Sequence, residues 1–288
     1  ALLVLTATLW AVFWWQRGHE ALAVLGVLCI AMPHAPVMAL EFLLLRRVNR
    51  NDAAPTPTRA ELMQAWVTEV LGAVVVFGWR LPFRSQRYAD TLPCDAPGRR
   101  GLLLVHGFVC NRGVWNPWWP RLRLAGVPCI ALDLQPVFGS IDDYADAIDE
   151  AVQRLTQATG RPPLLLGHSM GGLAIRAWLR SHAGHARIHG VVTVGTPHRG
   201  TWLGRFGYSA NGVQMRWESP WLGSLATVEA KGPFPRYTCF YSHCDNIVFP
   251  ASSATLPGAD NRHLRGHAHV HMLRHPDVLA EVLRRLQG

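Results

Sequence analysis

Residues 164–172, Leu-Leu-Leu-Gly-His-Ser-Met-Gly-Gly, constrain the fold more than any other stretch of the chain. The three leucines predict a short buried strand, and residues 173–180 predict the helix that follows. Between them, the glycines around Ser169 allow a sharp turn that lifts the serine hydroxyl above the sheet. The first N–H groups of the helix then face any negative charge that develops there. The stretch therefore predicts a tight turn with a nucleophilic serine, rather than a chance Gly-Ser turn.

The chain from residue 101 onward alternates between strand and helix patterns. Such alternation is typical of a mostly parallel sheet covered by helices, so we expect an α/β fold. Residues 199–235 interrupt the alternation and predict a lid insertion over the C-terminal edge of the sheet, where open α/β folds bind ligands. The predicted strands are 102–105, 127–132, 164–168, 191–194 and 237–241, and the predicted helices are 115–124, 141–157 and 277–286.

The N-terminal part of the chain is unusually apolar. Residues 1–15 end in Phe-Trp-Trp, and residues 21–45 are apolar again before a cluster of arginines. A helix that spans a bilayer needs about 20 apolar residues, and tryptophans and arginines are typical of its ends. We therefore expect a membrane-associated helical hairpin, with the rest of the chain on the cytoplasmic side. Pro33, His34 and Glu41 favour the alternative, a hydrophobic helical pair packed on the domain or on a second subunit.

Composition shifts divide the chain into three parts. Residues 1–50 form the hydrophobic, membrane-associated helical segment. Residues 51–99 are a linker and entry to the core, with a helix over 59–79 that becomes strand-like through 74–77. Residues 100–288 form the α/β domain that carries the serine.

Charge and cysteine content narrow the choice of partners. The chain has 28 basic and 19 acidic residues and a net charge of +9. No motif for nucleic-acid binding accompanies this charge, so we expect no such partner and favour attraction to anionic lipid headgroups. The six cysteines show no metal-ligand spacing, which predicts free thiols, with a Cys239–Cys244 disulfide as the alternative.

The serine needs a base, and the base needs a carboxylate to orient it. In folds of this kind the acid follows the serine in the chain and the histidine comes last. Asp245 comes just after the predicted strand 237–241, whereas Asp260 lies in a Gly-Ala-Asp-Asn turn. Spacing alone does not choose the base from a cluster of histidines, for which metal binding is the rival interpretation, although no acidic or cysteine ligands accompany it. The histidines of this cluster are His263, His267, His269, His271 and His275.

Acyl transfer also needs backbone donors for the oxyanion. Met170 follows the nucleophile directly and supplies one N–H. Phe108, in the loop after the first core strand, is the candidate for the second, because Gly107 lets the chain approach closely. A simple tight turn is the alternative interpretation of His106-Gly107.

Several segments together match a known pattern. They are His-Gly-Phe at 106–108, Gly-His-Ser-Met-Gly-Gly at 167–172, Val-Gly-Thr-Pro-His-Arg-Gly-Thr at 194–201, Gln-Met-Arg at 214–216 with Ser-Pro-Trp-Leu at 219–222, and Asp-Asn-Ile-Val at 245–248 with Pro250. Over residues 100–285 the chain resembles bacterial esterases and lipases of the α/β-hydrolase superfamily. The resemblance implies an α/β-hydrolase fold and ester hydrolysis.

The resemblance also bears on the base. In the family, the histidine precedes two apolar residues by three positions, and Met272-Leu273 are that pair here, which selects His269. Ala268 stands where the family has glycine, and Gly266-His267 offers a competing match. His267 is therefore the runner-up.

We thus expect a serine carboxylic-ester hydrolase at the bacterial inner membrane, with Ser169, Asp245 and His269 as its triad and with neither metal nor cofactor. Aromatic residues near the mouth and in the lid favour a medium or long acyl chain, although core packing is their alternative role. A phospholipase or acyl-thioesterase would use the same triad, and a non-catalytic binding protein or a membrane-tethered structural protein would need only the fold. The expected substrate contacts are His168, Trp202, Trp217 and Trp221, with Trp115, Trp118, Trp119 and Phe206 nearby.

Overall fold

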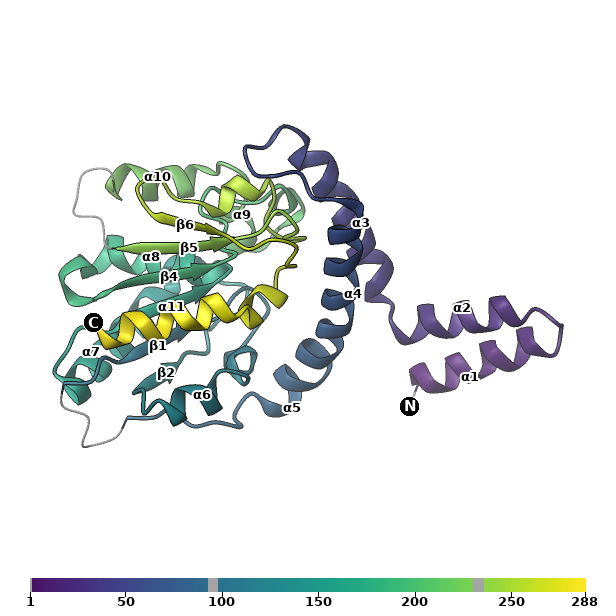
Figure 1. The fold of residues 1–288 in the computed structure, drawn as a ribbon, viewed down its shortest axis with the longest axis horizontal. Coiled ribbons are helices and arrows are strands. Elements are labelled where there is room, and N and C mark those ends of the chain that lie inside the picture. Colours follow the sequence, from purple (N-terminus) through teal and green to yellow (C-terminus); the bar gives the residue numbers. More distant parts are fainter. Residues whose placement is uncertain (1, 93–97, 230–235) are drawn as a thin grey trace.

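The computed structural model describes residues 2–92, 98–229 and 236–288. Within them, six strands form one parallel sheet in the order β2-β1-β3-β4-β5-β6 (Figure 1). The predicted α/β class with a mostly parallel sheet is therefore confirmed. The strands are β1 (Leu102–Val105), β2 (Cys129–Ala131), β3 (Leu164–His168), β4 (Gly190–Val194), β5 (Tyr237–Tyr241) and β6 (Asp260–His263).

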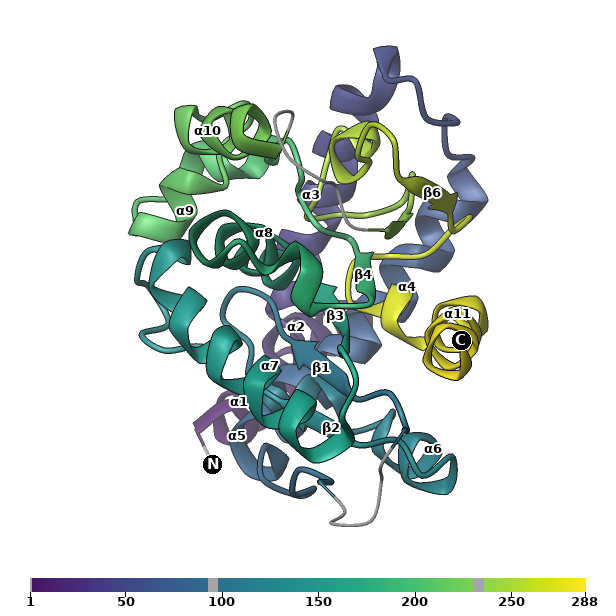
Figure 2. The same ribbon diagram turned by 90° about the vertical axis from the view of Figure 1, so that its left-hand side faces the viewer.

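Helices cover both faces of this sheet. Helices α7 (Ala145–Thr159) and α8 (Met170–His182) lie on one face, and α6 (Trp119–Leu124) and α11 (Pro276–Gln287) lie on the other (Figure 2). The inner strands are buried throughout, so each reads in the sequence as a continuous apolar run. Short 3-10 turns connect these elements: η3 (Arg112–Trp115), η4 (Ile141–Tyr144), η5 (Gly184–Arg187), η7 (Ala251–Ala254) and η8 (His271–Arg274).

Helix α7 follows the usual rules for a helix on a sheet. Ser140 and Asp143 form a capping box ahead of it, and Gly160 ends it with a positive φ of 69°. Its buried side chains recur every three or four residues, and its other faces are polar. They include Ile148, Ala151, Val152 and Leu155.

The predicted insertion folds as short helices between β4 and β5. They are η6 (Trp202–Phe206), α9 (Ala210–Gln214) and α10 (Pro220–Glu229). The Gln214 side chain accepts a hydrogen bond from the backbone N–H of Ile141 at 2.7 Å, which ties α9 to η4. Residues 230–235 of the predicted lid lie outside the described residues.

The first two helices, α1 (Leu2–Trp15) and α2 (Glu20–Ala31), form an antiparallel hairpin that projects away from the sheet (Figure 1). The indole of Trp10 lies against α2 and donates a hydrogen bond to the Leu22 carbonyl at 2.9 Å. A Cβ at Gly26 would lie 1.7 Å from this indole, so the glycine permits the close packing of the pair.

Two further helices, α3 (His34–Val48) and α4 (Arg59–Val75), lie across the ends toward which the strands point (Figure 1). The Trp66 indole donates to the Ala35 carbonyl at 3.0 Å and joins the two helices. Thr58 and Glu61 form a capping box that starts α4. The C-terminal edge of the sheet, where α/β folds place their sites, is thus covered by the N-terminal helices. Three short helical segments complete this region: the 3-10 helix η1 (Asn49–Asn51), the π-helix η2 (Val76–Arg80) and the α-helix α5 (Leu81–Arg84).

The structure corrects three sequence-based expectations of secondary structure. Residues 74–77 are helical, because α4 continues into η2 and presents Val74, Val75 and Phe77 outward instead of to a sheet. The Gly-Ala-Asp-Asn turn expected at residues 258–261 is formed only in part: Gly258 lies in a turn, but Asp260 and Asn261 begin β6, an edge strand whose polar side chains gave no apolar pattern. The second apolar stretch breaks into α2 and α3 around Pro33, which cannot donate a helical hydrogen bond.

By length and apolar composition alone, one described helix, residues 59–84, could cross a membrane. The segments 20–30 and 34–51 would make a second only if they count as one span bent by 81°. Among the described cysteines, Cys29, Cys110, Cys129, Cys239 and Cys244 are free thiols, so the Cys239–Cys244 alternative is not formed, and Cys94 lies outside the described residues.

Candidate active site

Ser169 sits at the turn between β3, in the middle of the sheet, and α8. Its φ of 54° and ψ of −128° are a strained conformation for a residue with a side chain. A Cβ at Gly171 would come within 2.2 Å of the Val105 carbonyl oxygen, and one at Gly167 within 2.6 Å of the Gly172 backbone. Only glycine fits at these two positions, which is the physical reason for the Gly-x-Ser-x-Gly pattern.

The loop after β1 lies against this turn. A Cβ at Gly107 would come within 2.7 Å of the Ser169 Cβ. His106 is buried, and its Nε2 accepts a hydrogen bond from the Leu134 N–H at 2.9 Å, so its Nδ1–H donates to the Gly107 carbonyl at 2.8 Å. Burial also lowers the pKa of His106, which favours this neutral form. The histidine therefore fixes the orientation of the peptide group that precedes Phe108.

The backbone N–H groups of Phe108 and Met170 are both available to a ligand. Neither donates to a protein acceptor within the described residues. Met170 is the first residue of α8, whose leading N–H groups have no acceptor inside the helix. Two such donors beside a serine hydroxyl are what a developing oxyanion requires.

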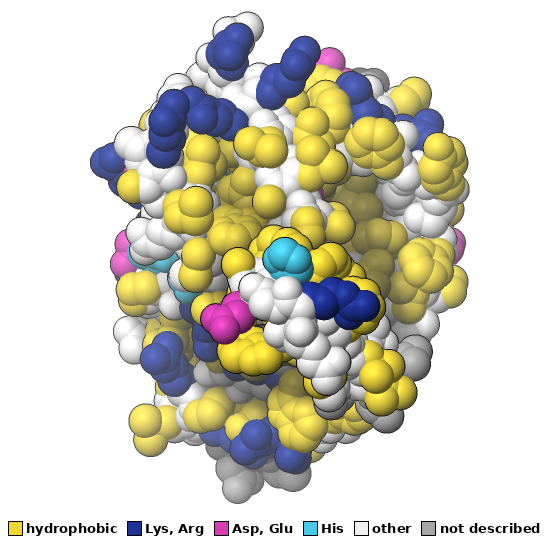
Figure 3. Space-filling view, turned by 90° about the vertical axis from the view of Figure 1, so that its right-hand side faces the viewer, with side chains coloured by type: hydrophobic (Ala, Val, Ile, Leu, Met, Phe, Trp, Pro, Cys, Tyr) yellow, Lys and Arg dark blue, Asp and Glu magenta, His cyan; other side chains and the backbone are white. Residues whose placement is uncertain are grey.

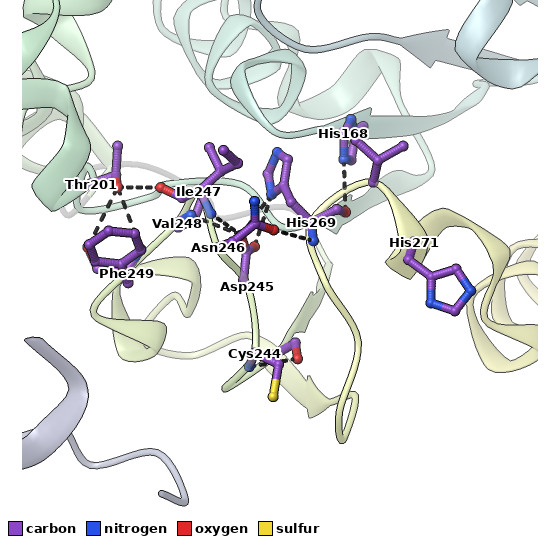
Figure 4. A network of polar contacts seen from close by, with 12 residues as sticks. His168, Thr201, Cys244, Asp245, Asn246, Ile247, Val248, Phe249, His269 and His271 are labelled. Carbon is purple, nitrogen blue, oxygen red and sulfur yellow. Dashed lines mark hydrogen bonds and ion pairs between the residues drawn. The ribbon is translucent and has the colours of Figure 1, made fainter. Parts of the chain in front are cut away.

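Asp245 and His269 form a buried pair at the same edge of the sheet (Figure 4). The Nδ1 atom of His269 lies 2.9 Å and 3.0 Å from the two carboxylate oxygens of Asp245. The N–H groups of Ile247 and Val248 donate to Asp245 Oδ1 at 3.0 and 2.8 Å, so the carboxylate is held rigidly. An acid that accepts from Nδ1–H leaves Nε2 of the histidine as the basic atom.

His267, the runner-up for the base, points elsewhere. Its Nδ1 lies 2.8 Å from the Arg265 carbonyl oxygen, and its ring contacts those of His271 and His275. Within the described residues no group of histidine, cysteine or acidic side chains is arranged to hold a metal ion. Of the two candidate histidines, the structure brings His269 to the carboxylate and leaves His267 apart.

Charge around His269 favours its protonated form. Burial lowers the pKa of this imidazole, but three carboxylates outweigh burial and raise the pKa above its ordinary value. They belong to Asp245, Glu69 and Glu41. A base whose charged form is stabilised accepts a proton from a serine more readily.

His168 is buried between the serine turn and the base. It precedes Ser169, and its ring centroid lies 4.7 Å from that of His269. The side chain is buried, and its Nε2 lies 3.4 Å from the His269 carbonyl oxygen. Burial first, and then the neighbouring His269, hold the pKa of His168 well below its ordinary value. Its predicted substrate contact is therefore left without support, and packing beside the base explains its presence.

Ser169 itself is 7% exposed, and its hydroxyl makes no hydrogen bond within the described residues. In hydrolases without a ligand the contact between serine and histidine is often long and tightens only when substrate binds.

The tryptophans divide into two groups. Trp115, Trp118 and Trp119 are fully buried on the α6 and α11 side of the sheet, so core packing, the alternative role, explains them. Trp202, Trp217 and Trp221 are half-buried in the insertion. Trp202 stacks on Phe249, and the indole of Trp221 donates to Asp142 at 2.9 Å.

One cavity of about 1070 Å³ has a lining that does not include Ser169. Its lining includes Arg176 and Glu229, which pair at 2.7 Å, and Arg284 and Glu281, which also pair at 2.7 Å. Such a charged lining does not suit an acyl chain.

The sequence model of the alpha/beta hydrolase family matches residues 102–254, more than half of the chain. The chain belongs to the α/β-hydrolase family. The matched range of this α/β hydrolase includes Phe108, Ser169 and Asp245 but ends before His269. The N-terminal helices also lie outside it.

Solved structures show the same fold at low identity. Mature lipase BlEst2 from Bacillus licheniformis is 17% identical, with a TM-score of 0.59 over 67% of this chain and 95% of the lipase. Lipase B from Aspergillus fumigatus is 19% identical, with a TM-score of 0.60 over 66% of this chain but only 53% of its own length. The monoacylglycerol lipase from Paleococcus ferrophilus is 16% identical, with a TM-score of 0.50 over 66% of this chain and 96% of that chain. No curated protein matches the hydrolase significantly.

Three residues beside the base were absent from the sequence-based site. Glu69 on α4 accepts hydrogen bonds from the loop of His269, and Glu41 on α3 bonds to Asn246, which in turn contacts His269. In the sequence, the one feature that could have drawn attention to Glu41 and Glu69 is that each is an acidic residue within a largely apolar helical segment.

Proposed function

We propose that this α/β hydrolase is a serine carboxylic-ester hydrolase with Ser169, Asp245 and His269 as its triad. The observation that carries the proposal is the strained serine turn together with the buried carboxylate–imidazole pair at the same sheet edge. Either feature alone occurs in proteins that catalyse nothing. Together they supply the nucleophile and the oriented base of acyl transfer.

The reaction proceeds through an acyl-enzyme. Ser169 Oγ attacks the carbonyl carbon of the ester while His269 Nε2 takes its proton, and the carbonyl oxygen becomes the oxyanion of a tetrahedral intermediate. The N–H groups of Phe108 and Met170 stabilise this oxyanion, each contributing about 3 kcal/mol. Asp245 holds the imidazole in the correct tautomer and stabilises its charged form. His269 then gives the proton to the leaving alcohol, and water releases the acid by the same steps.

The substrate is an acyl ester with a medium or long chain. Phe138 is 61% exposed beside the oxyanion loop, where its ring centroid lies 5.8 Å from that of Phe108. This pair offers an apolar surface next to the position of the scissile carbonyl. Trp202, stacked on Phe249 near the Asp245 loop, adds a second. A short polar ester would gain nothing from either surface.

The hydrolase works at a membrane surface, through its N-terminal helices. Hydrophobic side chains cover much of the face that carries the α1–α2 hairpin, and arginines gather toward its edges (Figure 3). An exposed apolar area with basic residues around it suits a bilayer with anionic headgroups. Arg46, Arg47 and Arg50, beyond the apolar segment, favour the cytoplasmic side of a bacterial inner membrane for the catalytic domain.

A panel of substrates tests this proposal. Purified full-length protein is assayed on p-nitrophenyl esters of increasing chain length, triacylglycerols, phospholipids and acyl-thioesters, beside the Ser169→Ala variant. We expect turnover of carboxylic esters that rises with chain length and is lost in Ser169→Ala, with an unchanged circular dichroism spectrum. Activity retained by Ser169→Ala would overturn the assignment of the nucleophile. Faster turnover of phospholipids or thioesters would instead assign the hydrolase to that substrate class.

A further inference from the structure

Helix α4 holds the loop that carries the base. The carboxylate of Glu69 accepts hydrogen bonds from two consecutive backbone N–H groups, that of Val270 at 2.8 Å and that of His271 at 3.1 Å. These two residues directly follow His269: Val270 is the N-cap of η8, and His271 is its first residue. The first N–H groups of a helical turn have no acceptor within it, so Glu69 caps η8 from a helix about 200 residues away in the chain.

A second carboxylate reaches the same loop from α3. Glu41 accepts a hydrogen bond from the side-chain amide of Asn246 at 2.7 Å. The amide oxygen of Asn246 accepts from the backbone N–H of His269 at 3.3 Å (Figure 4). Asn246 also follows Asp245, so this bridge contacts both members of the acid–base pair. Three consecutive N–H groups, from His269 to His271, thus depend on two N-terminal helices.

The burial of the Glu69 carboxylate costs considerable free energy. The residue is 3% exposed, and no arginine or lysine forms an ion pair with it within the described residues. Burial raises the pKa of its carboxyl to about 7, although the N–H groups of Val270 and His271 and the charge of His269 oppose the rise. A glutamine or an apolar residue would attach α4 to the domain at a lower cost. A carboxylate here is explained by what only a carboxylate does: it accepts two hydrogen bonds at once and carries a negative charge toward His269.

We propose that Glu69 is a positioning residue for His269, and that Glu41 acts as a second one through Asn246. The N-terminal helices then belong to the catalytic machinery, outside the range matched by the family. Glu69 fixes the backbone at the two positions after the base and so fixes the direction of the imidazole toward Ser169. This inference rests on the proposed serine chemistry.

Several charged and titratable groups surround Glu69, and they determine which pH effect its removal has. His269 and Asp245 face it from the catalytic loops. Arg80, His271 and Arg274 line the same small cavity. Because the negative charge of Glu69 raises the pKa of His269, its loss lowers that pKa. The acidic limb of the kcat/KM profile then moves to lower pH, an effect that a merely structural contact would not produce.

The test compares Glu69→Ala, Glu69→Gln and the control Gln64→Ala in full-length protein, with a soluble p-nitrophenyl ester. Gln64 lies on the exposed face of the same helix. We expect kcat to fall about 100-fold in Glu69→Ala with KM within about two-fold of wild type, because a base displaced by about 1 Å loses that much. Glu69→Gln keeps one acceptor, so it recovers part of the rate, and its acidic limb moves to lower pH. Gln64→Ala changes neither.

The outcomes separate this inference from the proposed function. Wild-type protein without esterase activity, or an active Ser169→Ala, defeats the proposed function itself. An active wild type whose kcat and acidic limb are unchanged in both Glu69 variants overturns the positioning role alone. Circular dichroism and urea unfolding establish that each variant is folded, and the nearly isosteric Glu69→Gln carries the test if Glu69→Ala does not fold.

Discussion

The core helix α7 and the N-terminal helix α4 are built on opposite patterns. In α7 the apolar side chains face the sheet and the charges face solvent. In α4 the buried face carries Glu69, and an apolar stripe at helical spacing is exposed. This stripe comprises Met63, Val67, Leu71 and Val74. Helix α4 therefore has two partners: its inner face contacts the catalytic loop through Glu69, and its outer face suits an apolar environment better than water.

The two regions also divide the site between them. The core, which the family model recognises, supplies Ser169, Asp245 and the two oxyanion donors. The N-terminal helices supply no reacting atom, yet they bind the loop of His269 through Glu69 and Glu41. Three of the predictions below pair a change in one region with a counterpart in the other, and a fourth concerns Glu69 alone.

The largest contrast is between the two carboxylates that serve His269. Asp245→Asn removes the acceptor of Nδ1–H and traps the imidazole in the wrong tautomer, so we expect kcat to fall about 10⁴-fold. Glu69→Gln, on the N-terminal side, lowers kcat far less. Steady-state kinetics on a soluble ester measure both. Equal losses would mean that the base is held by the N-terminal helices as strongly as by the core.

Glycines in the two regions respond to alanine with opposite signs. A Cβ at Gly171 would lie 2.2 Å from a backbone oxygen, so Gly171→Ala destabilises the core by about 3 kcal/mol. No described residue has an atom within 4 Å of a Cβ at Gly72 in α4, so Gly72→Ala stabilises by about 0.5–1 kcal/mol. Urea unfolding measures both free energies. A neutral Gly171→Ala would show that the serine turn is looser than described.

The secondary structure of the core was predicted from the sequence more accurately than that of the N-terminal helices, for physical reasons. The bounds of β1, β3 and β5 were predicted as observed, since strands buried on both faces are continuous apolar runs. Edge strand β6 was missed because only its backbone pairs with the sheet and its side chains are polar.

The site divides in the same way. Asp245 was chosen by its place after a strand and His269 by a family motif, and the structure pairs the two. Glu69 and Glu41 could not be placed, because no local pattern tells which distant loop an acid in an apolar helix will meet. Trp115, Trp118 and Trp119 were expected near the mouth with core packing as the alternative, because composition does not distinguish a core aromatic from a substrate contact.

The raised pKa of Glu69 in the N-terminal helices also makes the free energy of unfolding depend on pH. The pKa of Glu69 is raised by burial to about 7 in the folded protein, against an ordinary value of 4.5. The folded state therefore binds more protons between these values, and the free energy of unfolding falls as pH rises through this window. Urea midpoints of wild type and Glu69→Gln at pH 4.5 and 7.5 measure the effect. We expect the wild type to lose more stability across the interval, and parallel curves would contradict the pKa.

The smallest expected effect concerns the exposed face of α4. The double variant Val67→Gln with Leu71→Gln removes apolar area from the proposed lipid-binding surface, and we expect about ten-fold weaker binding to anionic vesicles. Hydrolysis of a soluble ester should not change. Leu124→Gln is the control on the core, at an apolar position that is even more exposed (91%, against 41% for Val67 and 56% for Leu71), and it should bind as wild type does. Weakening in both variants would make the binding non-specific.

The most direct test of the account is covalent labelling with a fluorophosphonate, followed by intact-protein and peptide mass spectrometry. We predict one adduct per chain, on Ser169, formed at the same rate in wild type and Gln64→Ala and more slowly in Glu69→Ala. Ser169→Ala should take up no label. An unlabelled wild type, or a label on any other residue, would contradict the assignment of Ser169 as the nucleophile.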